Sequence, residues 1–144
     1  MGGRRQALRY EDTLGYRVHR AEQAICARKV EVLRQLELTV AQEQVLAFLL
    51  GGVEKSATQL GREANVTSQT MTGVLSGLET RGLVTRRPSP DHGRVRLYSL
   101  TDPGRAVAQQ ANELVMAYEC ELLGRLAPEE REILAKALER IAEK

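Results

Sequence analysis

The sequence predicts a mainly α-helical fold that carries one small β-hairpin wing. Along most of the chain, apolar residues recur at three- and four-residue steps, which is the period of an amphipathic α-helix. Between Gly82 and Thr101 this pattern gives way to β-branched and aromatic residues on either side of the turn-rich stretch PSPDHG. Because 144 residues are close to the commonest size of one domain, we expect residues 1–144 to form a single domain.

The composition is that of a folded protein outside the membrane. Hydrophobic residues make up 42% of the chain and charged residues 28%, unlike the apolar-poor composition of a disordered chain. No apolar stretch reaches the ~18 residues of a membrane span, and the N-terminus lacks the apolar core of a signal peptide. Cys26 and Cys120 lie far apart within helical patterns, unlike the cysteines of a disulfide-rich secreted domain. We therefore expect a cytoplasmic protein with reduced cysteines and no membrane partner.

The first two expected helices have clear starts. Residues 13–36 place Leu14, Val18 and Ile25 at helical spacing and predict one long helix. Thr39, with Gln42 three residues later, resembles a capping box. It opens VAQEQVLAFLL, a helix that is apolar nearly all round and is therefore expected to be buried.

Two short helices joined by a tight turn are expected next. Ser56 and Gln59 repeat the capping pattern at the start of SATQLGREA. Thr67 is suited to cap the next helix, over residues 68–81, which ends at Gly82. This arrangement is typical of a helix-turn-helix.

The remaining elements are a hairpin and two more helices. LVTRR and RVRLYSL have the composition of β-strands. Asp102 and Pro103 mark the start of a second long helix, and Pro128 lies in the first turn of a final helix. The order of all elements predicts a winged helix-turn-helix over residues 39–101, flanked by long N- and C-terminal helices at 11–36 and 102–144.

A winged helix-turn-helix binds double-stranded DNA by placing its second helix in the major groove, where each base pair presents a distinct pattern of donors and acceptors. Gln69, near the start of that helix, is expected to read a base, because a Gln amide pairs with adenine through two hydrogen bonds. Thr72 on the same face suits a thymine methyl group or a phosphate. Hydroxyl groups at helix N-termini suit phosphate oxygens.

The hairpin adds positive charge beside this helix. The formal net charge of the chain is only +2, but residues 81–96 contain five arginines and a single acid, Asp91. A narrow minor groove attracts inserted arginine side chains. The expected DNA contacts are the polar and basic side chains of the helix pair and the hairpin, namely Ser56, Thr67, Ser68, Gln69, Thr72, Ser76, Arg86, Arg87, His92 and Arg94.

The segment VTSQTMTGVLSGLETRGLVTRRPSPDHGRVRLYSLTDPG, together with the long helices on both sides, resembles the MarR (multiple antibiotic resistance regulator) family of winged-helix transcription regulators. The resemblance implies a repressor that binds a pseudo-palindromic operator as a homodimer and leaves it when a small-molecule effector, an oxidant or a metal acts. It also implies that residues 68–81 form the recognition helix and that Arg94 enters the minor groove. The family's wing has an aspartate two residues before this arginine, where this chain has His92.

The apolar surface of the long flanking helices points independently to a homodimer. A small winged domain is too small to cover it, so a second copy is the expected cover for the helices at 11–36 and 102–144.

Two alternatives remain open from the sequence. The arginine-bearing hairpin also suits a winged-helix protein-interaction module that binds an acidic protein. Cys26 also suits a cysteine-based redox-sensing regulator, although a buried thiol without nearby cations is inert.

Other chemistry has weaker support. His19, Glu22 and Cys26 share a helix face at a spacing compatible with zinc, but the chain has few further His or Cys ligands, so no metal and no cofactor are expected. GGVEKS lacks the glycine that directly precedes the lysine of a phosphate-binding loop. Ser89, Asp91 and His92 crowd into one loop, unlike a hydrolase triad. We therefore expect a protein that is not an enzyme.

Overall fold

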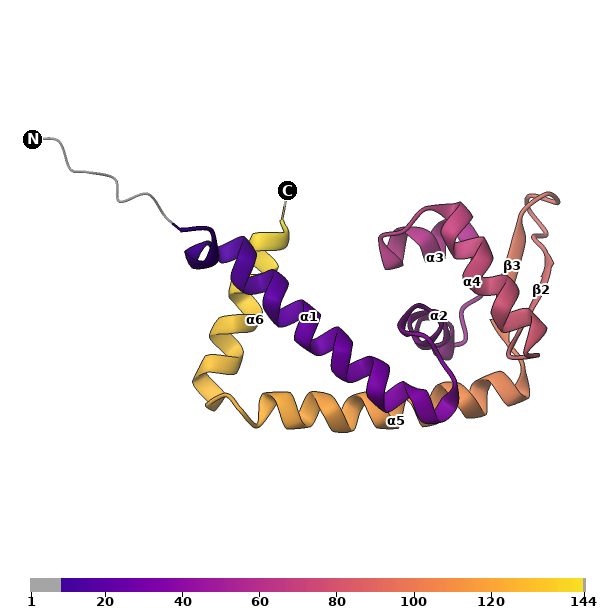
Figure 1. Ribbon diagram of the computed structural model, residues 1–144. Helices are drawn as coiled ribbons and strands as arrows, with labels where there is room; N and C mark the ends of the chain where they lie inside the picture. The colour runs from indigo at the N-terminus through magenta and orange to yellow at the C-terminus, as the bar shows by residue number, and fades with distance from the viewer. Residues whose placement is uncertain (1–8, 144) are drawn as a thin grey trace, which may run out of the picture.

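The computed structural model describes residues 9–143, and Figure 1 shows how its helices and strands are arranged. The predicted mainly helical fold with a small β-hairpin wing is confirmed. The outermost residues of the expected domain, 1–8 and 144, lie outside the described part. The described elements are two 3-10 turns (Tyr10–Asp12 and Arg34–Leu36), helices α1 (Leu14–Leu33), α2 (Val40–Leu50), α3 (Ala57–Ala64), α4 (Ser68–Thr80), α5 (Asp102–Leu123) and α6 (Pro128–Ala142), and strands β1 (Lys55–Ser56), β2 (Val84–Pro88) and β3 (Arg96–Leu100).

The predicted capping boxes are both confirmed. The Thr39 hydroxyl accepts the Gln42 N–H at 3.1 Å, and the Gln42 side chain accepts the Thr39 N–H at 3.1 Å. Ser56 and Gln59 make the same pair of bonds at 3.2 and 2.8 Å. Since the first N–H groups of a helix have no partner within it, these residues fix where α2 and α3 begin.

The predicted stop at Gly82 is confirmed as well. Gly82 has φ +69° and donates its N–H to the Glu79 carbonyl at 2.9 Å, while Leu83 donates to Leu78 at 3.0 Å. This pattern is a Schellman motif, in which a left-handed glycine closes the helix. It turns the chain from α4 directly into β2.

The sheet has three strands, although the sequence predicted two. β3 lies in the middle and pairs antiparallel with β2 on one side and with β1 on the other. The third strand, β1, pairs Lys55 with Tyr98 and Ser56 with Leu97. A strand of two residues has no alternation of its own, which is why the sequence pattern missed it.

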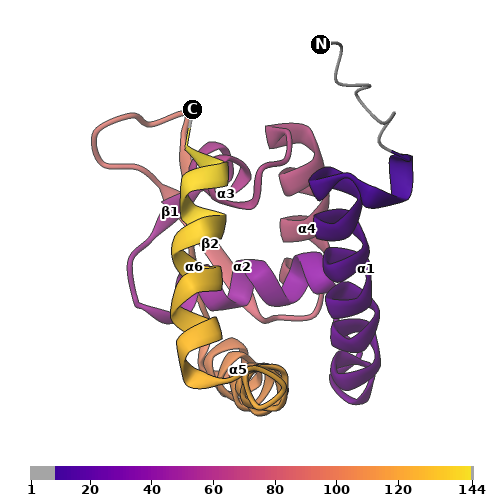
Figure 2. The same cartoon turned by 90° about the vertical axis from the view of Figure 1, so that its left-hand side faces the viewer.

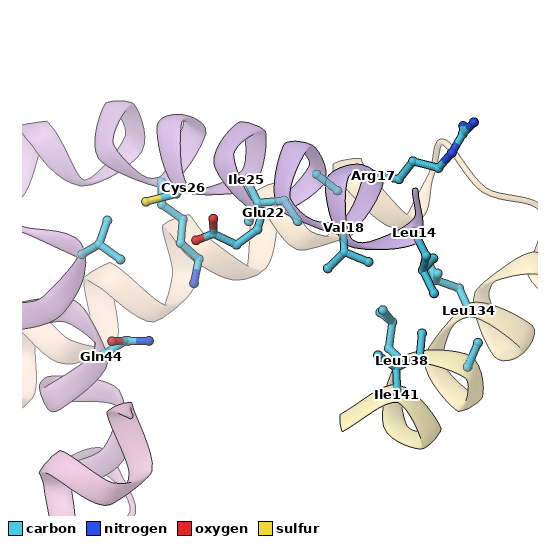
Figure 3. Close-up of a pocket in the computed structure, with 14 residues that line it drawn as sticks. Leu14, Arg17, Val18, Glu22, Ile25, Cys26, Gln44, Leu134, Leu138 and Ile141 are labelled. Atoms are coloured by element: carbon cyan, nitrogen blue, oxygen red, sulfur yellow. The ribbon is translucent and has the colours of Figure 1, made fainter. Parts of the chain in front are cut away.

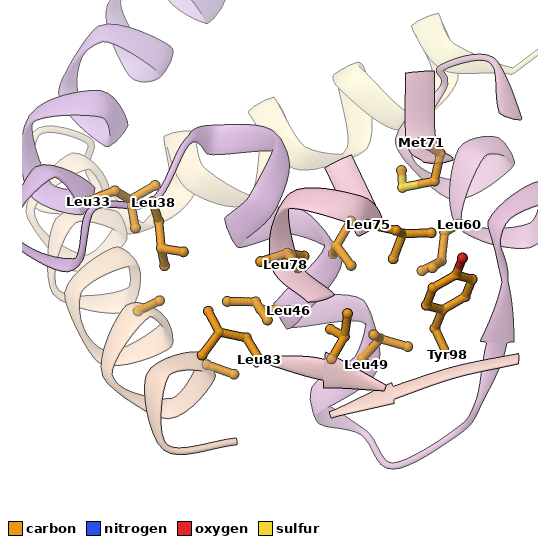
Figure 4. Close-up of a cluster of buried hydrophobic side chains, with 14 of the residues drawn as sticks. Leu33, Leu38, Leu46, Leu49, Leu60, Met71, Leu75, Leu78, Leu83 and Tyr98 are labelled. Atoms are coloured by element: carbon orange, nitrogen blue, oxygen red, sulfur yellow. The ribbon is translucent and has the colours of Figure 1, made fainter. Parts of the chain in front are cut away.

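The hydrophobic core is built around α2. As Figure 4 shows, Leu46 and Leu49 of α2 lie among side chains from the helix pair, the sheet and α5. The expectation that α2 is buried is confirmed, since Val45, Leu46 and Leu49 are at most 2% exposed. The other buried members of this core are Leu33, Leu38, Leu60, Met71, Leu75, Leu78, Leu83, Val84, Tyr98, Ala108, Ala111 and Val115.

A close contact joins the sheet to α5. Thr101 caps α5 by accepting the Gly104 N–H at 3.0 Å, and its hydroxyl donates to the Gly82 carbonyl at 2.6 Å. Gly104 is buried against the Leu83 backbone so tightly that a Cβ built on it would lie 1.7 Å from the Leu83 carbonyl oxygen. Only glycine fits at this position of the junction.

Helices α1, α5 and α6 form the other half of the molecule. Figure 1 shows α6 rising from the end of α5. In Figure 2, where α5 is seen end-on, α1 and α6 lie on opposite sides of the view. Arg28 of α1 lies 6.0 Å from the ring centre of Tyr118 on α5, at a cation–π distance. The apolar side chains of α6 are not covered by the described chain, since Ile133, Leu134, Leu138 and Ile141 all remain exposed.

Among residues 9–143, one charged residue is buried in the otherwise apolar interior. Glu43 of α2 is only 6% exposed, and its Oε2 has no hydrogen-bond partner within residues 9–143. Burial raises the pKa of the Glu43 carboxyl above its ordinary value, while the positive charge of Lys29 acts in the opposite direction. An ionised carboxylate in this position destabilises the fold.

We expect Glu43→Met to raise the free energy of unfolding at pH 7.5 by about 1–3 kcal/mol, because it removes an unpaired buried charge. Between the ordinary pKa and the raised folded-state pKa, the folded wild type binds more protons than the unfolded chain, so its stability falls as pH rises. The difference in free energy of unfolding between Glu43→Met and the wild type should therefore grow with pH across this window and become smaller below the ordinary pKa. Chemical denaturation over a pH series measures it.

The matched control is Glu113→Met, at an exposed position on α5. It should change the free energy of unfolding by less than about 0.5 kcal/mol at any pH in the series. If the stability difference between Glu43→Met and the wild type does not depend on pH, the pKa of Glu43 is not raised by burial and the explanation is wrong.

Candidate nucleic-acid interface

The turn between α3 and α4 sets the two helices of the predicted pair against each other. Asn65 ends α3 in the left-handed region at φ 55°, and the Val66 N–H donates to the Gly61 carbonyl at 2.8 Å. A Cβ on Gly61 would lie 3.0 Å from the Val66 carbonyl oxygen, so glycine permits the close approach. As predicted, Thr67 caps α4, and its hydroxyl accepts the Thr70 N–H at 3.1 Å.

Helix α4 has one buried face and one exposed face. Apolar side chains recur on one side of the helix, where Met71, Leu75 and Leu78 are buried and Val74 is half-buried. The opposite face is open to solvent and contains the expected contacts Ser68, Gln69, Thr72 and Ser76.

The threonine hydroxyls on this exposed face bind the helix's own backbone. Thr72 Oγ1 donates to the Ser68 carbonyl at 2.8 Å, and Thr80 Oγ1 donates to the Ser76 carbonyl at 3.0 Å. A hydroxyl has a single proton to donate. The protons of both side chains are therefore already bound within α4.

Residues 89–95 form a loop that protrudes beyond the sheet, as Figures 1 and 2 show. Ser89 N–H donates to the Val95 carbonyl and Val95 N–H donates to the His92 carbonyl, both at 2.8 Å. The sequence pattern placed the start of the second strand at Arg94, but these turn bonds hold Arg94 and Val95 in the loop, and β3 begins at Arg96. The expected wing contacts His92 and Arg94 thus lie at its tip.

The five arginines of the basic patch differ in what they bind. Arg81 donates to the Leu36 and Glu37 carbonyls at 3.1 and 2.8 Å and so ties the end of α4 to the segment before α2. Arg86 lies 3.3 Å from a carboxylate oxygen of Glu79. These two cations are engaged within the protein.

Arg87 forms the most complete ion pair. Its Nε and Nη2 both bind the Glu54 carboxylate at 2.8 Å, in a bidentate arrangement. The hydrogen bond from Arg87 lowers the pKa of Glu54, and the same bond raises the pKa of Arg87. Both groups therefore stay charged and paired at neutral pH, with Arg87 drawn toward the loop before β1.

Arg94 is the arginine of this patch with a free guanidinium. Arg96 donates to the Gly93 carbonyl at 3.3 Å, whereas Arg94 is exposed and has no ion pair or side-chain hydrogen bond within the described chain. Asp91, the acid nearest to it in sequence, makes no ion pair with it. The loop thus presents one unpaired cation.

An apolar groove lies apart from this face, between α1, α2 and α6 (Figure 3). Its volume is about 640 Å³. In Figure 3, Leu14 and Val18 of α1 face Leu134 and Leu138 of α6, while Cys26 lies at the end nearer Gln44 of α2. Apolar residues recur at helical spacing along α1 and α6 in the sequence. The sequence does not show that these two faces meet, because their meeting depends on how α5 and α6 place the C-terminal end of the chain.

Cys26 is half-buried in this groove, and Lys29 lines the same groove. Neither cysteine forms a disulfide, and Cys120 is exposed. Within residues 9–143, no three His, Cys, Asp or Glu side chains are grouped as a metal site would require. No helix of this part of the chain is both long and apolar enough to cross a membrane.

A tightly turned helix pair, an exposed polar face on its second helix and a protruding basic hairpin define a winged helix-turn-helix DNA-binding protein. The sequence profile of the MarR family matches residues 36–95. The HTH-type transcriptional repressor Rv2887 of Mycobacterium tuberculosis is 37% identical over 120 residues, which is 83% of this chain and 86% of Rv2887. The chain belongs to the MarR family.

Two solved structures agree with this assignment. The transcriptional repressor CouR bound to a 23-mer DNA duplex superposes with a TM-score of 0.85 at 30% identity, covering 92% of this chain and 94% of CouR. The complex of Rv2887 with salicylic acid has a TM-score of 0.71 at 32% identity and covers 90% and 96% of the two chains. Both relatives are regulators of transcription, which points away from an enzyme.

Proposed function

We propose that this protein is a cytoplasmic, homodimeric transcription repressor that binds a pseudo-palindromic operator and is released from it by a small-molecule effector. In this proposal, residues 39–101 form the DNA-reading unit, and the helices at 11–36 and 102–144 form the dimer. The protein acts through binding and has no catalytic role. The observation that carries the proposal is the exposed polar face of α4 beside the unpaired Arg94.

The DNA contacts follow from this face. Gln69 near the start of α4 would read a base edge in the major groove, with Thr72 and Ser76 on the same face. Ser56, Thr67 and Ser68 lie at helix N-termini, which attract phosphate oxygens. Arg94 would enter the minor groove, with His92 beside it at the tip. Arg86 and Arg87 would reach phosphates only by leaving Glu79 and Glu54.

The apolar groove supports the homodimer and the effector. Leu14 and Ile141 at its walls are 59% and 52% exposed, and a second copy of the chain would cover them. The end near α2 lies between the long helices and the reading unit. There Lys29 supplies a positive charge in a groove that is lined mainly by apolar side chains but also by Glu22 and Gln44, and this charge suits a small acidic molecule such as the salicylic acid bound by Rv2887.

Selection from random DNA duplexes tests the function. The expected result is enrichment of one inverted repeat, with half-sites about one helical turn apart or a multiple of it. Fluorescence anisotropy with the enriched duplex then gives the affinity and its salt dependence. No enrichment at modest salt would contradict the proposal and favour a protein-interaction module.

We expect Arg94→Ala to weaken binding to the selected duplex by about tenfold to a hundredfold and to reduce the salt dependence by about two ions, because it removes one inserted cation from each protomer of the dimer. Anisotropy titrations at several salt concentrations measure both. The matched control is Arg125→Ala, which removes the same charge beyond the end of α5, where Arg125 pairs with Glu121. Equal losses for the two variants would contradict a role of Arg94 at the wing tip.

A further inference from the structure

If the protein binds DNA as proposed, the side chains on the exposed face of α4 determine which base pairs it selects. The exposed face of α4 contains no Lys or Arg, since residues 68–80 read SQTMTGVLSGLET. Bidentate contacts from Arg or Lys to the O6 and N7 atoms of guanine are the commonest specific contacts in the major groove. This helix lacks the side chains that make them.

The hydroxyl of Thr72 is not free to replace them. Its proton is bound to the Ser68 carbonyl at 2.8 Å, so it has no proton left for a guanine, a thymine O4 or a phosphate. Thr72 is exposed, and with the hydroxyl turned to the backbone its γ-methyl is the group available to a ligand. The side chain can therefore offer a base its γ-methyl as an apolar contact, and its hydroxyl oxygen only as an acceptor.

The surroundings of Thr72 leave this methyl group accessible. A Cβ built on the neighbouring Gly73 would meet no atom within 4 Å, and Thr72 and Gly73 are both exposed, so no other part of the protein covers this face of α4 beside Thr72. Gln69 and Ser76 lie three and four positions away on the same side of the helix. A base edge in the major groove can reach Thr72 directly.

We propose that Thr72 reads thymine through the contact of its γ-methyl with the thymine C5-methyl group. Among the four bases, thymine alone presents a methyl group in the major groove. Gln69 on the same face is suited to adenine. The half-site bases under the N-terminal half of α4 are therefore A·T pairs, selected by an apolar contact and an amide.

The test removes the methyl group first from the DNA and then from the protein. In the selected duplex, each thymine of the half-site is replaced by deoxyuridine, which lacks only the C5-methyl. Thr72→Ser removes the γ-methyl and keeps the hydroxyl, while Thr72→Val keeps a methyl at that place and removes the hydroxyl. Anisotropy titrations give the affinity of each protein for each duplex, and thermal unfolding verifies that the variants fold.

We expect uracil at one thymine per half-site to weaken wild-type binding about fourfold for each half-site, the value of one buried methyl group. Thr72→Ser should bind the thymine duplex with that same loss and show no further loss with uracil. Thr72→Val should keep the sensitivity to uracil. The control Gln69→Ala should bind more weakly overall and keep the full thymine-to-uracil difference.

Two results overturn the inference while leaving the proposed function intact. In one, a selected duplex is bound tightly but no uracil position affects the wild type. In the other, Thr72→Ser keeps the same thymine-to-uracil difference as the wild type at every position. Failure to select any duplex would instead overturn the proposed function and this inference together.

Discussion

Replacing Gly104 by alanine is expected to lower the free energy of unfolding by about 3 kcal/mol or more. The new Cβ would lie 1.7 Å from the Leu83 carbonyl oxygen, and the same oxygen accepts the Thr101 N–H at 3.1 Å. Neither backbone can move away alone, because Thr101 also binds Gly82 and Gly104. The junction between the sheet and α5 must open to admit one methyl group.

Denaturant unfolding followed by circular dichroism measures this loss. Gly73→Ala is the matched control, since its Cβ would meet no atom within 4 Å and alanine favours a helix. That variant should be as stable as the wild type or more stable. A Gly104→Ala protein with an unchanged unfolding midpoint would show that the close contact is absent in solution.

Leu138→Glu is expected to convert the dimer to a monomer and to weaken operator binding by about a hundredfold or more. Leu138 of α6 lines the apolar groove and is 43% exposed. A charge at this position disrupts the apolar surface that is proposed to bind a second copy, while the single chain can still fold. A monomer engages one half-site only and loses the gain that comes from binding two linked sites.

Analytical ultracentrifugation and anisotropy measure the two effects, and circular dichroism verifies that the helices remain. Lys136→Glu is the control on the same helix, at a position that lies outside the groove and pairs with Glu132. It should stay dimeric and bind the operator. A dimeric Leu138→Glu protein would exclude this face as the interface.

Local patterns in the sequence were enough to predict most of the fold. The capping boxes at Thr39 and Ser56, the cap at Thr67 and the glycine stop at Gly82 involve residues three to five positions apart, and all are confirmed. The edges of the sheet were less predictable. Its third strand is defined only by pairing with β3, and the start of β3 depends on turn bonds within the loop.

The candidate interface depends more on distant contacts. Arg87 and Glu54 are 33 residues apart, and Arg81 reaches backbone carbonyls 44 and 45 residues away. No local pattern contains such partners, so the sequence could place five arginines in one patch but not separate the engaged ones from Arg94. The burial of Glu43 could not be predicted from the sequence for the same reason, since it follows from the packing of other helices around α2.

The engaged arginines affect how such a protein finds its operator within a genome. Binding to DNA of arbitrary sequence is driven by the release of counterions from phosphates, and the many other sites of a chromosome compete with the operator through this term. Arg86 and Arg87 are already neutralised by Glu79 and Glu54, so they add little to it. We therefore expect the repressor to bind bulk DNA weakly and to be more fully available to its specific sites.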